Sequence, residues 1–144
     1  MPDIFAKNKR SSIMAAIHSS GGAPETIAAR LFRRAGIRGW RRQNRRLPGK
    51  PDFTFQPERL AIFIDGCFWH QCPSCKRRLM PRSNKAFWIK KLAANVRRDR
   101  RVNRELRLLD WHVLRVWEHA LRPAVAGRFQ KRIGRYLRSW PKPP

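Results

Sequence analysis

The chain has few acidic residues. Its 144 residues include 9 Asp and Glu against 34 Lys and Arg, which gives a formal net charge of +25. Folding does not require such an excess, because like charges repel one another in the compact state. A polyanionic partner would neutralise the charge, and we expect that partner to be nucleic acid. An anionic membrane is the alternative, but the basic residues are spread along the chain and form no single amphipathic helix.

Long apolar runs are also missing. No stretch approaches the roughly 18 residues that a membrane-spanning helix needs, and no apolar secretory segment follows Met1. Cysteine is scarce as well, and three cysteines are an odd number, which is a poor basis for a disulfide framework. We therefore expect a cytoplasmic protein with reduced thiols and no membrane partner.

The composition is sufficient for one folded domain. Hydrophobic residues make up 42% of the chain and there are 6 Trp, which argues against intrinsic disorder. We predict a basic, DNA-binding N-terminal arm over residues 1–22, a single domain over 23–140 and a frayed tail over 141–144.

The order of predicted elements indicates an α/β fold, with a mixed central sheet flanked by helices. Helical spacing, apolar alternation and turn residues define the elements. They are a helix over 24–35, a possible strand over 37–42, strands over 52–55 and 60–65 joined by a hairpin turn, a helix over 85–109, a strand over 113–117 and a helix over 124–140. In the long helix the apolar residues at helical spacing are Ile89, Leu92, Val96, Leu106 and Leu109.

All three cysteines lie in one window of nine residues, at Cys67, Cys72 and Cys75. Three thiolates indicate zinc, which needs a fourth ligand in a structural tetrahedral site. The histidines that could supply it are His18, His70, His112 and His119. We prefer His119, because it follows the strand over 113–117 and could tie the loop down from a distant element. The alternative is three buried cysteines without metal, or a pair that oxidises.

Few carboxylates are expected on a DNA-binding surface, so their positions are informative. Asp52 begins one strand of the hairpin and Asp65 ends the other, which places both at the same end of the sheet. Neighbouring carboxylates suit Mg²⁺, and Mg²⁺ beside a phosphodiester promotes hydrolysis. We expect Asp52 to be catalytic and His70 to act as a general base. Spacing alone leaves Glu25 and Asp99 open between catalysis and salt bridges with basic residues.

Several motifs carry a resemblance to a known family. Pro51-Asp52 followed by a hairpin and Asp65-Gly66-Cys67 resembles the PD-(D/E)xK nuclease pattern, with Cys67 in place of the lysine. Together with four further motifs, in order and at matching spacing over about residues 7–120, it closely resembles the very-short-patch mismatch-repair endonucleases. Those motifs are Leu47-Pro48-Gly49 before Pro51, Phe68-Trp69-His70, Phe87-Trp88 with Asn95-x3-Asp99, and Trp111-x-Val113-Leu114-Arg115-Val116-Trp117-Glu118.

The resemblance implies a restriction-endonuclease-like fold and a monomeric enzyme. Such an enzyme uses Mg²⁺ to nick one strand of double-stranded DNA beside a T·G mismatch, which arises from deaminated 5-methylcytosine, and so initiates very short patch repair. It implies that Asp52 and the backbone carbonyl of Ile64 hold Mg²⁺, with His70 as general base supported by Glu25 and Asp99. The role of Asp65 is less defined, because members of the family carry either His or Asp there. The implied ligands of a structural zinc are Cys67, Cys72, Cys75 and His119.

Large aromatic residues beside the cysteines are either plugs over the metal or wedges for DNA. Apolar wedges unstack base steps, and a mismatched step is easier to open. The resemblance implies that Phe68, Trp69 and Trp88 form such a wedge, with Met14 of the arm entering the other groove. We expect phosphate contacts from Lys7, Lys9 and Arg10.

Two other functions fit the same residues. One is a restriction-type or structure-specific nickase of the same fold. The other is a non-catalytic zinc protein that binds nucleic acid and uses its acids only for structure. The second is disfavoured because binding alone does not require acids and a base at one end of a sheet.

Overall fold

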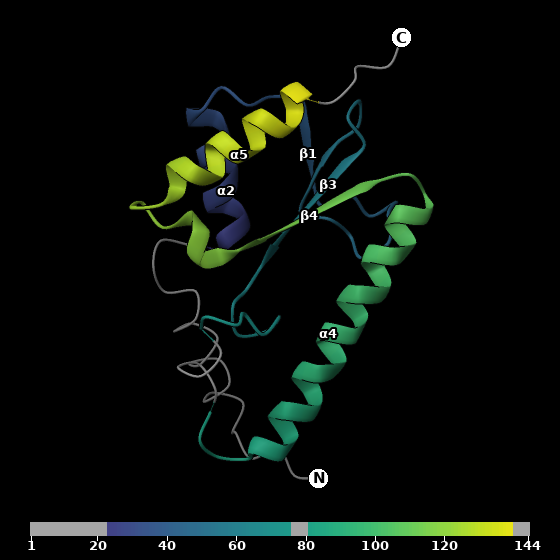
Figure 1. Ribbon diagram of the computed structural model, residues 1–144, viewed down its shortest axis with the longest axis vertical. Coiled ribbons are helices and arrows are strands. Elements are labelled where there is room, and N and C mark those ends of the chain that lie inside the picture. Colours follow the sequence, from purple (N-terminus) through teal and green to yellow (C-terminus); the bar gives the residue numbers. More distant parts are fainter. Residues whose placement is uncertain (1–22, 76–80, 140–144) are drawn as a thin grey trace.

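The computed structural model describes residues 23–75 and 81–139, which form a mixed sheet between helices (Figure 1). The predicted α/β class and the order of elements are confirmed. The elements are α2 (Pro24–Arg34), β1 (Trp40–Arg42), β2 (Phe53–Phe55), β3 (Leu60–Asp65), α4 (Lys85–Leu108), β4 (His112–Trp117), the short 3-10 helix η1 (Glu118–Leu121) and α5 (Ala126–Ser139). The predicted arm, with Lys7, Lys9, Arg10 and Met14, lies outside the described residues.

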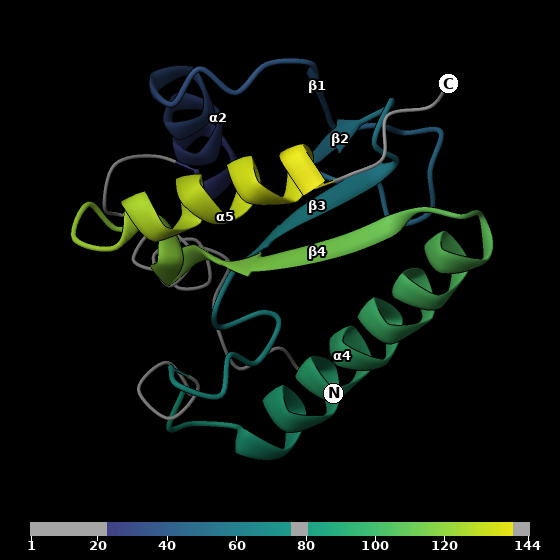
Figure 2. The same cartoon turned by 45° about the horizontal axis from the view of Figure 1, so that its top comes forward.

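The sheet has the strand order β1-β2-β3-β4. β2 is antiparallel to both β1 and β3, whereas β3 and β4 are parallel. Helices α2 and α5 cover one face, and α4 covers the other (Figure 2). Among the described residues, no helix is both long and apolar enough to cross a membrane.

Strand β3 is the centre of the core, and all six of its residues are buried. Successive side chains of a strand point to opposite faces. Accordingly Ile62 and Ile64 pack against α2 and α5, whereas Ala61 and Phe63 pack against α4. Burial on both faces explains why this strand has a continuous apolar sequence.

The predicted apolar face of the long helix is partly wrong. Ile89 is 58% exposed and Leu109 is 49% exposed, whereas Leu92, Val102 and Leu106 are buried. The first half of α4 extends beyond the sheet (Figure 1), where Leu92 packs with Phe68 and Trp88 instead of with a strand, and Ile89 is left exposed. Leu109 follows the end of the helix and marks its C-terminal cap.

Candidate active site and metal centre

The loop that leaves β3 brings the predicted zinc ligands together. The ligand atoms of Cys67, Cys72, Cys75 and His119 all lie within 4.8 Å of one another. Nδ1 of His119 is 3.3 Å from Sγ of Cys67, 3.7 Å from that of Cys72 and 3.6 Å from that of Cys75. The cysteines are buried and free of disulfide bonds. Three soft sulfur donors and one imidazole in a closed arrangement fit a tetrahedral structural zinc.

The protonation of the thiols supports a cation in this cluster. Burial above all, with smaller contributions from the neighbouring thiols and Glu118, raises the pKa of the Cys67 thiol to about 12, although a hydrogen bond with His119 acts to lower it. Burial also acts to raise the pKa of Cys72, but backbone N–H groups of Ser74 and Cys75 lower it below its ordinary value. Three adjacent thiolates therefore need a positive charge among them, and metal binding supplies it while releasing the protons.

Glu118 anchors the cysteine loop and was not identified from the sequence. Its Oε1 accepts a hydrogen bond of 3.0 Å from the backbone N–H of Cys67. It begins the 3-10 helix that also carries His119. The only sequence signal was its position in the last motif, directly before His119.

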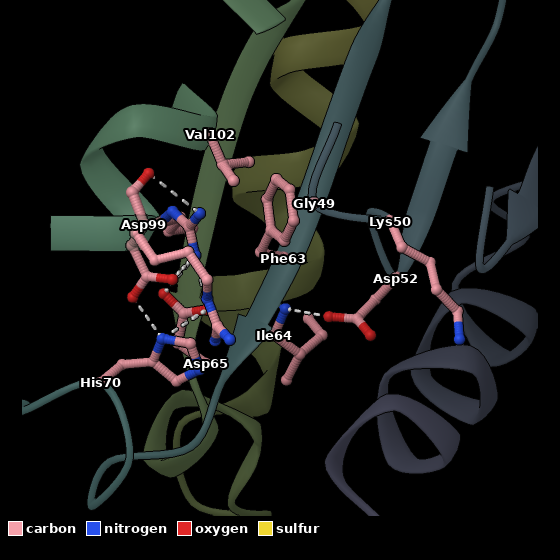
Figure 3. A pocket seen from close by; sticks show the side chains of 11 residues that line it. Gly49, Lys50, Asp52, Phe63, Ile64, Asp65, His70, Asp99 and Val102 are labelled. Carbon is pink, nitrogen blue, oxygen red and sulfur yellow. Dashed lines mark hydrogen bonds and ion pairs between the residues drawn. The ribbon is translucent and has the colours of Figure 1, made fainter. Parts of the chain in front are cut away.

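A pocket opens between the sheet and α4 on the other side of the loop (Figure 3). Its volume is about 390 Å³, which exceeds by far the roughly 30 Å³ of liquid volume per water molecule. It therefore has room for a hydrated ion and a phosphate group. Its lining residues are Gly49, Lys50, Asp52, Phe63, Ile64, Asp65, His70, Arg98, Asp99, Val102 and Arg115.

Asp52 is fixed by the hairpin. Its Oδ2 accepts a hydrogen bond of 2.7 Å from the backbone N–H of Ile64 on the neighbouring strand (Figure 3). The pKa of Asp52 is raised to about 6, chiefly by burial and further by the charges of Glu25 and Asp65, whereas the hydrogen bond from the Ile64 N–H acts to lower it. A buried carboxylate next to other acids is a place where a bound divalent cation would lower the electrostatic energy.

His70 and Asp99 form a pair in the same pocket. Nδ1 of His70 lies 2.5 Å from Oδ2 of Asp99. This contact explains why an acid occupies the inner face of α4. The backbone N–H of His70 donates to the backbone carbonyl of Gly66 at 3.1 Å, so a turn of the loop also holds His70 in place. With Nδ1–H donating to Asp99, Nε2 of His70 is left as the acceptor, which is the state that a general base requires.

Asp65 lies at the same end of the sheet as Asp52, as the hairpin predicts, but its carboxylate has a different environment. It is 4% exposed, and Nη1 of Arg115 donates to its two oxygens at 2.9 and 3.2 Å. Burial raises the pKa of Asp65, and the Arg115 charge opposes this rise. Of the pocket acids, Asp65 is thus the one that Arg115 contacts most closely.

Sequence reasoning missed two basic residues of the pocket. Arg115 occupies β4 at a position whose neighbours along the strand, Leu114 and Val116, are buried against the opposite face. A charged residue between two buried apolar residues of the strand was the available signal. Lys50 lies directly before Pro51 and Asp52 and lines the pocket. Its backbone adopts a left-handed conformation, with φ of 52°.

The other predicted site residues lie around this pocket. Glu25 is in the first turn of α2 and is close enough to raise the pKa of Asp52. Ile64 contributes its main chain to the pocket wall beside Asp52.

The three predicted wedge residues form one aromatic cluster, in which Leu92 also takes part. Phe68 is fully buried and Trp88 is 3% exposed, whereas Trp69 is partly buried. Ring centroids are 4.9 Å apart for Phe68 and Trp69, and 5.4 Å apart for Phe68 and Trp88. Asn95 of α4 donates to the carbonyl of Trp69 at 3.3 Å. In this state of the protein the aromatic residues are packed against one another.

Comparisons with known proteins place the chain in one family. The model of the family described as DNA mismatch endonuclease Vsr matches residues 2–77. The DNA mismatch endonuclease Vsr of Escherichia coli (strain K12) is 42% identical over 122 residues, which cover 85% of this chain and 77% of that protein.

Two type II nicking enzymes are also similar. V.NmeAIP of Neisseria meningitidis is 36% identical over 138 residues, which cover 96% of both chains. V.NaeI of Lentzea aerocolonigenes is 43% identical over 122 residues, which cover 81% of this chain and 72% of that protein. The pocket with its carboxylates and histidine is what a phosphodiester-cleaving enzyme needs, and the chain belongs to the Vsr family of DNA mismatch endonucleases and is a hydrolytic DNA endonuclease.

Proposed function

We propose that the protein nicks one strand of duplex DNA next to a T·G mismatch, in a reaction that depends on Mg²⁺. The observation that carries the proposal is one pocket that contains both Asp52, ready to bind a cation, and the His70–Asp99 pair. The name of the Escherichia coli relative supports mismatch recognition, and the names of the nicking enzymes support cleavage of a single strand.

Asp52 and the backbone carbonyl of Ile64 would hold the Mg²⁺ ion, with Glu25 and Asp99 near its water shell. When bound, the ion polarises the phosphoryl oxygens and stabilises the leaving oxygen. Hard carboxylate and carbonyl oxygens are the donors that Mg²⁺ prefers, so the residues present fit the ion.

His70 takes the proton of the attacking water on Nε2. The water oxygen forms a new bond to phosphorus, and the bond from phosphorus to the leaving sugar oxygen breaks. Asp99 accepts the Nδ1–H hydrogen bond, so it fixes the ring orientation and stabilises the imidazolium that forms. Lys50 and Arg98 line the pocket and offer positive charge to the phosphate.

The aromatic cluster supplies mismatch recognition. Phe68, Trp69 and Trp88 would leave their mutual packing to enter the base stack, where unstacking costs a few kcal/mol per step. A T·G pair stacks and pairs less well than a matched pair, so the wedge enters there at a lower cost. Lys91, whose Nζ lies 5.9 Å from the Trp69 ring centroid, places a cation for phosphate contact beside the wedge.

Zinc held by Cys67, Cys72, Cys75 and His119 would be structural. The cluster has no open position, so it would take no part in the reaction. Its effect is to fix the loop whose middle carries Phe68, Trp69 and His70. The metal thereby holds the wedge and the base at defined distances from Asp52.

The test is an assay of the purified protein on end-labelled T·G and C·G duplexes, with and without Mg²⁺. We expect a nick in one strand of the T·G duplex, only with Mg²⁺, and its loss in Asp52→Ala. Asp110→Asn is the matched control, because Asp110 is exposed and lies outside the pocket. Equal cleavage of C·G would indicate a nickase of other specificity. Absence of cleavage on every duplex would indicate a binding protein.

A further inference from the structure

Arg115 is the most extensively bonded side chain of the pocket. In the parallel register of β3 and β4 it lies opposite Phe63, and its guanidinium carbon is 4.2 Å from the Phe63 ring centroid. Its Nε donates to Oδ1 of Asn103 at 2.7 Å, and its Nη2 donates to the carbonyl of Asp99 at 3.5 Å. With Nη1 on Asp65, all three nitrogens of the group have partners, which fixes its position.

The acids that Arg115 contacts form a potential metal site with the catalytic base. One ligand atom each of Asp65, His70 and Asp99 lie within 4.8 Å of one another, a spacing that could hold a metal ion. Nδ1 of His70 is 3.7 Å from Oδ1 of Asp65 and 2.5 Å from Oδ2 of Asp99. A divalent cation bound there would displace the Nδ1 proton and prevent His70 from acting as the proposed base.

Arg115 places its own positive charge on these two carboxylates. Its Nη1 is 2.9 Å from Oδ1 of Asp65 and 3.6 Å from Oδ1 of Asp99. Arginine stays protonated at every accessible pH, and its planar fork suits two oxygens at once. The guanidinium thus provides the charge compensation that a metal ion would otherwise provide.

We propose that Arg115 is a positioning residue that takes the place of a cation between Asp65 and Asp99. It holds Asp99 against Nδ1 of His70 and keeps divalent metals off the base, so that they bind at Asp52 instead. This rests on the proposed function, in which His70 is the base and Asp52 the magnesium ligand. It also assigns Asp65 to the support of the base rather than to Mg²⁺.

Metal binding in paired variants tests the proposal apart from activity. The probe is Mn²⁺, followed by the loss of its free electron-paramagnetic-resonance signal, with zinc-loaded protein. Asp52→Asn removes the proposed first site. In that background we expect no tight Mn²⁺ site with Arg115 present, one new site in Arg115→Met, and its loss again when Asp65→Asn is added. Unchanged Mn²⁺ binding on Arg115→Met would overturn the proposal.

Arg115→Lys is the control for a folding defect, because it retains the positive charge beside Asp65 and Asp99. We expect it to exclude Mn²⁺ as the wild type does, while failing to hold both carboxylates. Both Arg115 variants should lower the nicking rate at saturating DNA by about 10- to 100-fold, as removal of an outer partner of a site typically does. The affinity for DNA should not change, and a loss of affinity with an unchanged rate would contradict the positioning role. If wild type and Asp52→Asn bind Mn²⁺ equally, the proposed magnesium site is wrong, but the comparison of Arg115 variants still stands.

A second, independent feature is a row of basic residues along α5. Its five cations are all exposed, each lies three or four residues from another, and the helix contains no acid. They are Arg128, Lys131, Arg132, Arg135 and Arg138. Ala126, Phe129 and Ile133 on the opposite side of the helix are buried. At 1.5 Å per residue the row, which we call the α5 stripe, is about 15 Å long.

The α5 stripe points away from the active site. α5 covers the sheet face opposite α4, and the pocket lies on the α4 face (Figure 2). Like charges three and four residues apart destabilise a helix, and bound phosphates would remove that repulsion. We infer that the α5 stripe binds a second segment of duplex DNA, separate from the segment that is cut.

A bridging assay tests this inference. The protein is mixed with immobilised duplex, and the retention of a second, fluorescent duplex is measured. The variant Arg128→Gln/Arg132→Gln/Arg135→Gln should lose retention and keep its nicking rate on a short duplex. The salt dependence of retention should fall by about 0.9 in logarithmic slope per lost phosphate contact.

The control removes the same charge elsewhere, at the exposed residues Arg41, Arg45 and Arg46. It should retain the second duplex. Equal loss in this control would show that net charge alone is responsible and would overturn the inference. Slower nicking by the α5 variant would also overturn it, because the stripe would then hold the same duplex that is cut.

Discussion

The cysteine cluster and the pocket cluster lie on two sides of the same loop, yet their chemistry differs. The cysteine cluster has soft donors, and its three thiols are at most 6% exposed. The pocket has hard oxygen donors beside an open volume of about 390 Å³. Closed soft sites suit zinc as a structural ion, whereas open hard sites suit Mg²⁺ and a substrate. Residues 67–75 thus connect a cluster suited to a structural metal ion with a pocket suited to a reaction.

The two clusters also differ in how their charge is balanced. The pocket has arginine and lysine of its own, and Arg115 pairs with Asp65 and Asp99. In the other cluster burial, with smaller contributions from Cys75, Glu118 and Cys72, raises the pKa of the Cys67 thiol to about 12, so its thiolate is disfavoured unless a cation is bound. We therefore expect the pocket to depend less on a bound metal for its geometry than the cysteine cluster does. Variants should separate these two dependencies.

The largest effect is expected from Cys72→Ser, which removes one zinc ligand. Bound zinc should fall below one per chain and the melting temperature should drop, because folding and metal binding are coupled in such loops. Nicking should be lost as well, since the loop carries His70. Zinc content by mass spectrometry and thermal melting measure this. A variant that lost zinc but nicked normally would break the proposed dependence of the pocket on the cysteine cluster.

His70→Ala should affect the pocket alone. We expect the nicking rate to fall by about 10²- to 10⁴-fold, which is the usual contribution of a general base. Zinc content and melting temperature should stay close to the wild-type values, because His70 does not belong to the cluster of Cys67, Cys72, Cys75 and His119 proposed to bind zinc. Single-turnover nicking at saturating DNA is the measurement. If His70→Ala lost zinc, the separation between the two clusters would be wrong.

Asp52 should make the pocket sensitive to pH. Its pKa of about 6 in the folded protein exceeds the ordinary value of 3.8, so the folded protein retains a proton that the unfolded chain releases. Stability of the metal-free protein should therefore fall as pH rises from about 4 to 6, by up to about 3 kcal/mol from this group. Mg²⁺ binds the charged form and should reverse the loss above pH 6.

The corresponding measurement is the rise in melting temperature with added Mg²⁺. It should be larger at pH 7.5 than at pH 5, where roughly one Asp52 in ten is charged and Mg²⁺ affinity is about tenfold weaker. Asp52→Asn should show no such rise at either pH, which separates Asp52 from Asp65. Equal shifts at both pH values in the wild type would mean that Mg²⁺ does not bind at Asp52.

The sequence predicted the two clusters because their geometry follows from local rules. An antiparallel hairpin necessarily brings Asp52 and Asp65 to one end of the sheet. A window with three cysteines restricts the missing ligand to a few histidines. The roles of Arg115 and Glu118 depend instead on the parallel pairing of β3 with β4, between segments about 50 residues apart. No local pattern specifies that pairing, so their partners could not be predicted.

The aromatic residues show a second limit. Phe68 and Trp69 in a loop fit a plug and a wedge equally well, and only their packing against Trp88 shows which arrangement the free protein adopts. The prediction that Ile89 belongs to the apolar face of the long helix failed for a similar reason. Helical spacing cannot show where the supporting sheet ends, and Ile89 is exposed. Local sequence defines which side chains share a face, but the length of the neighbouring element decides whether that face is covered.

The smallest expected effect concerns the connection between the two clusters. Glu118 accepts the N–H of Cys67 at 3.0 Å, so it ties the cysteine loop to the end of β4. Glu118→Ala leaves this half-buried N–H without its acceptor, which should cost about 1–3 kcal/mol in unfolding free energy. Glu118→Gln retains an acceptor oxygen and should cost less than 1 kcal/mol. Because the anchor acts on the whole loop, Glu118→Ala should also lower the nicking rate, but by less than His70→Ala. A large rate loss in Glu118→Gln would contradict this, since it would mean that the charge of Glu118, rather than its hydrogen bond, serves the reaction.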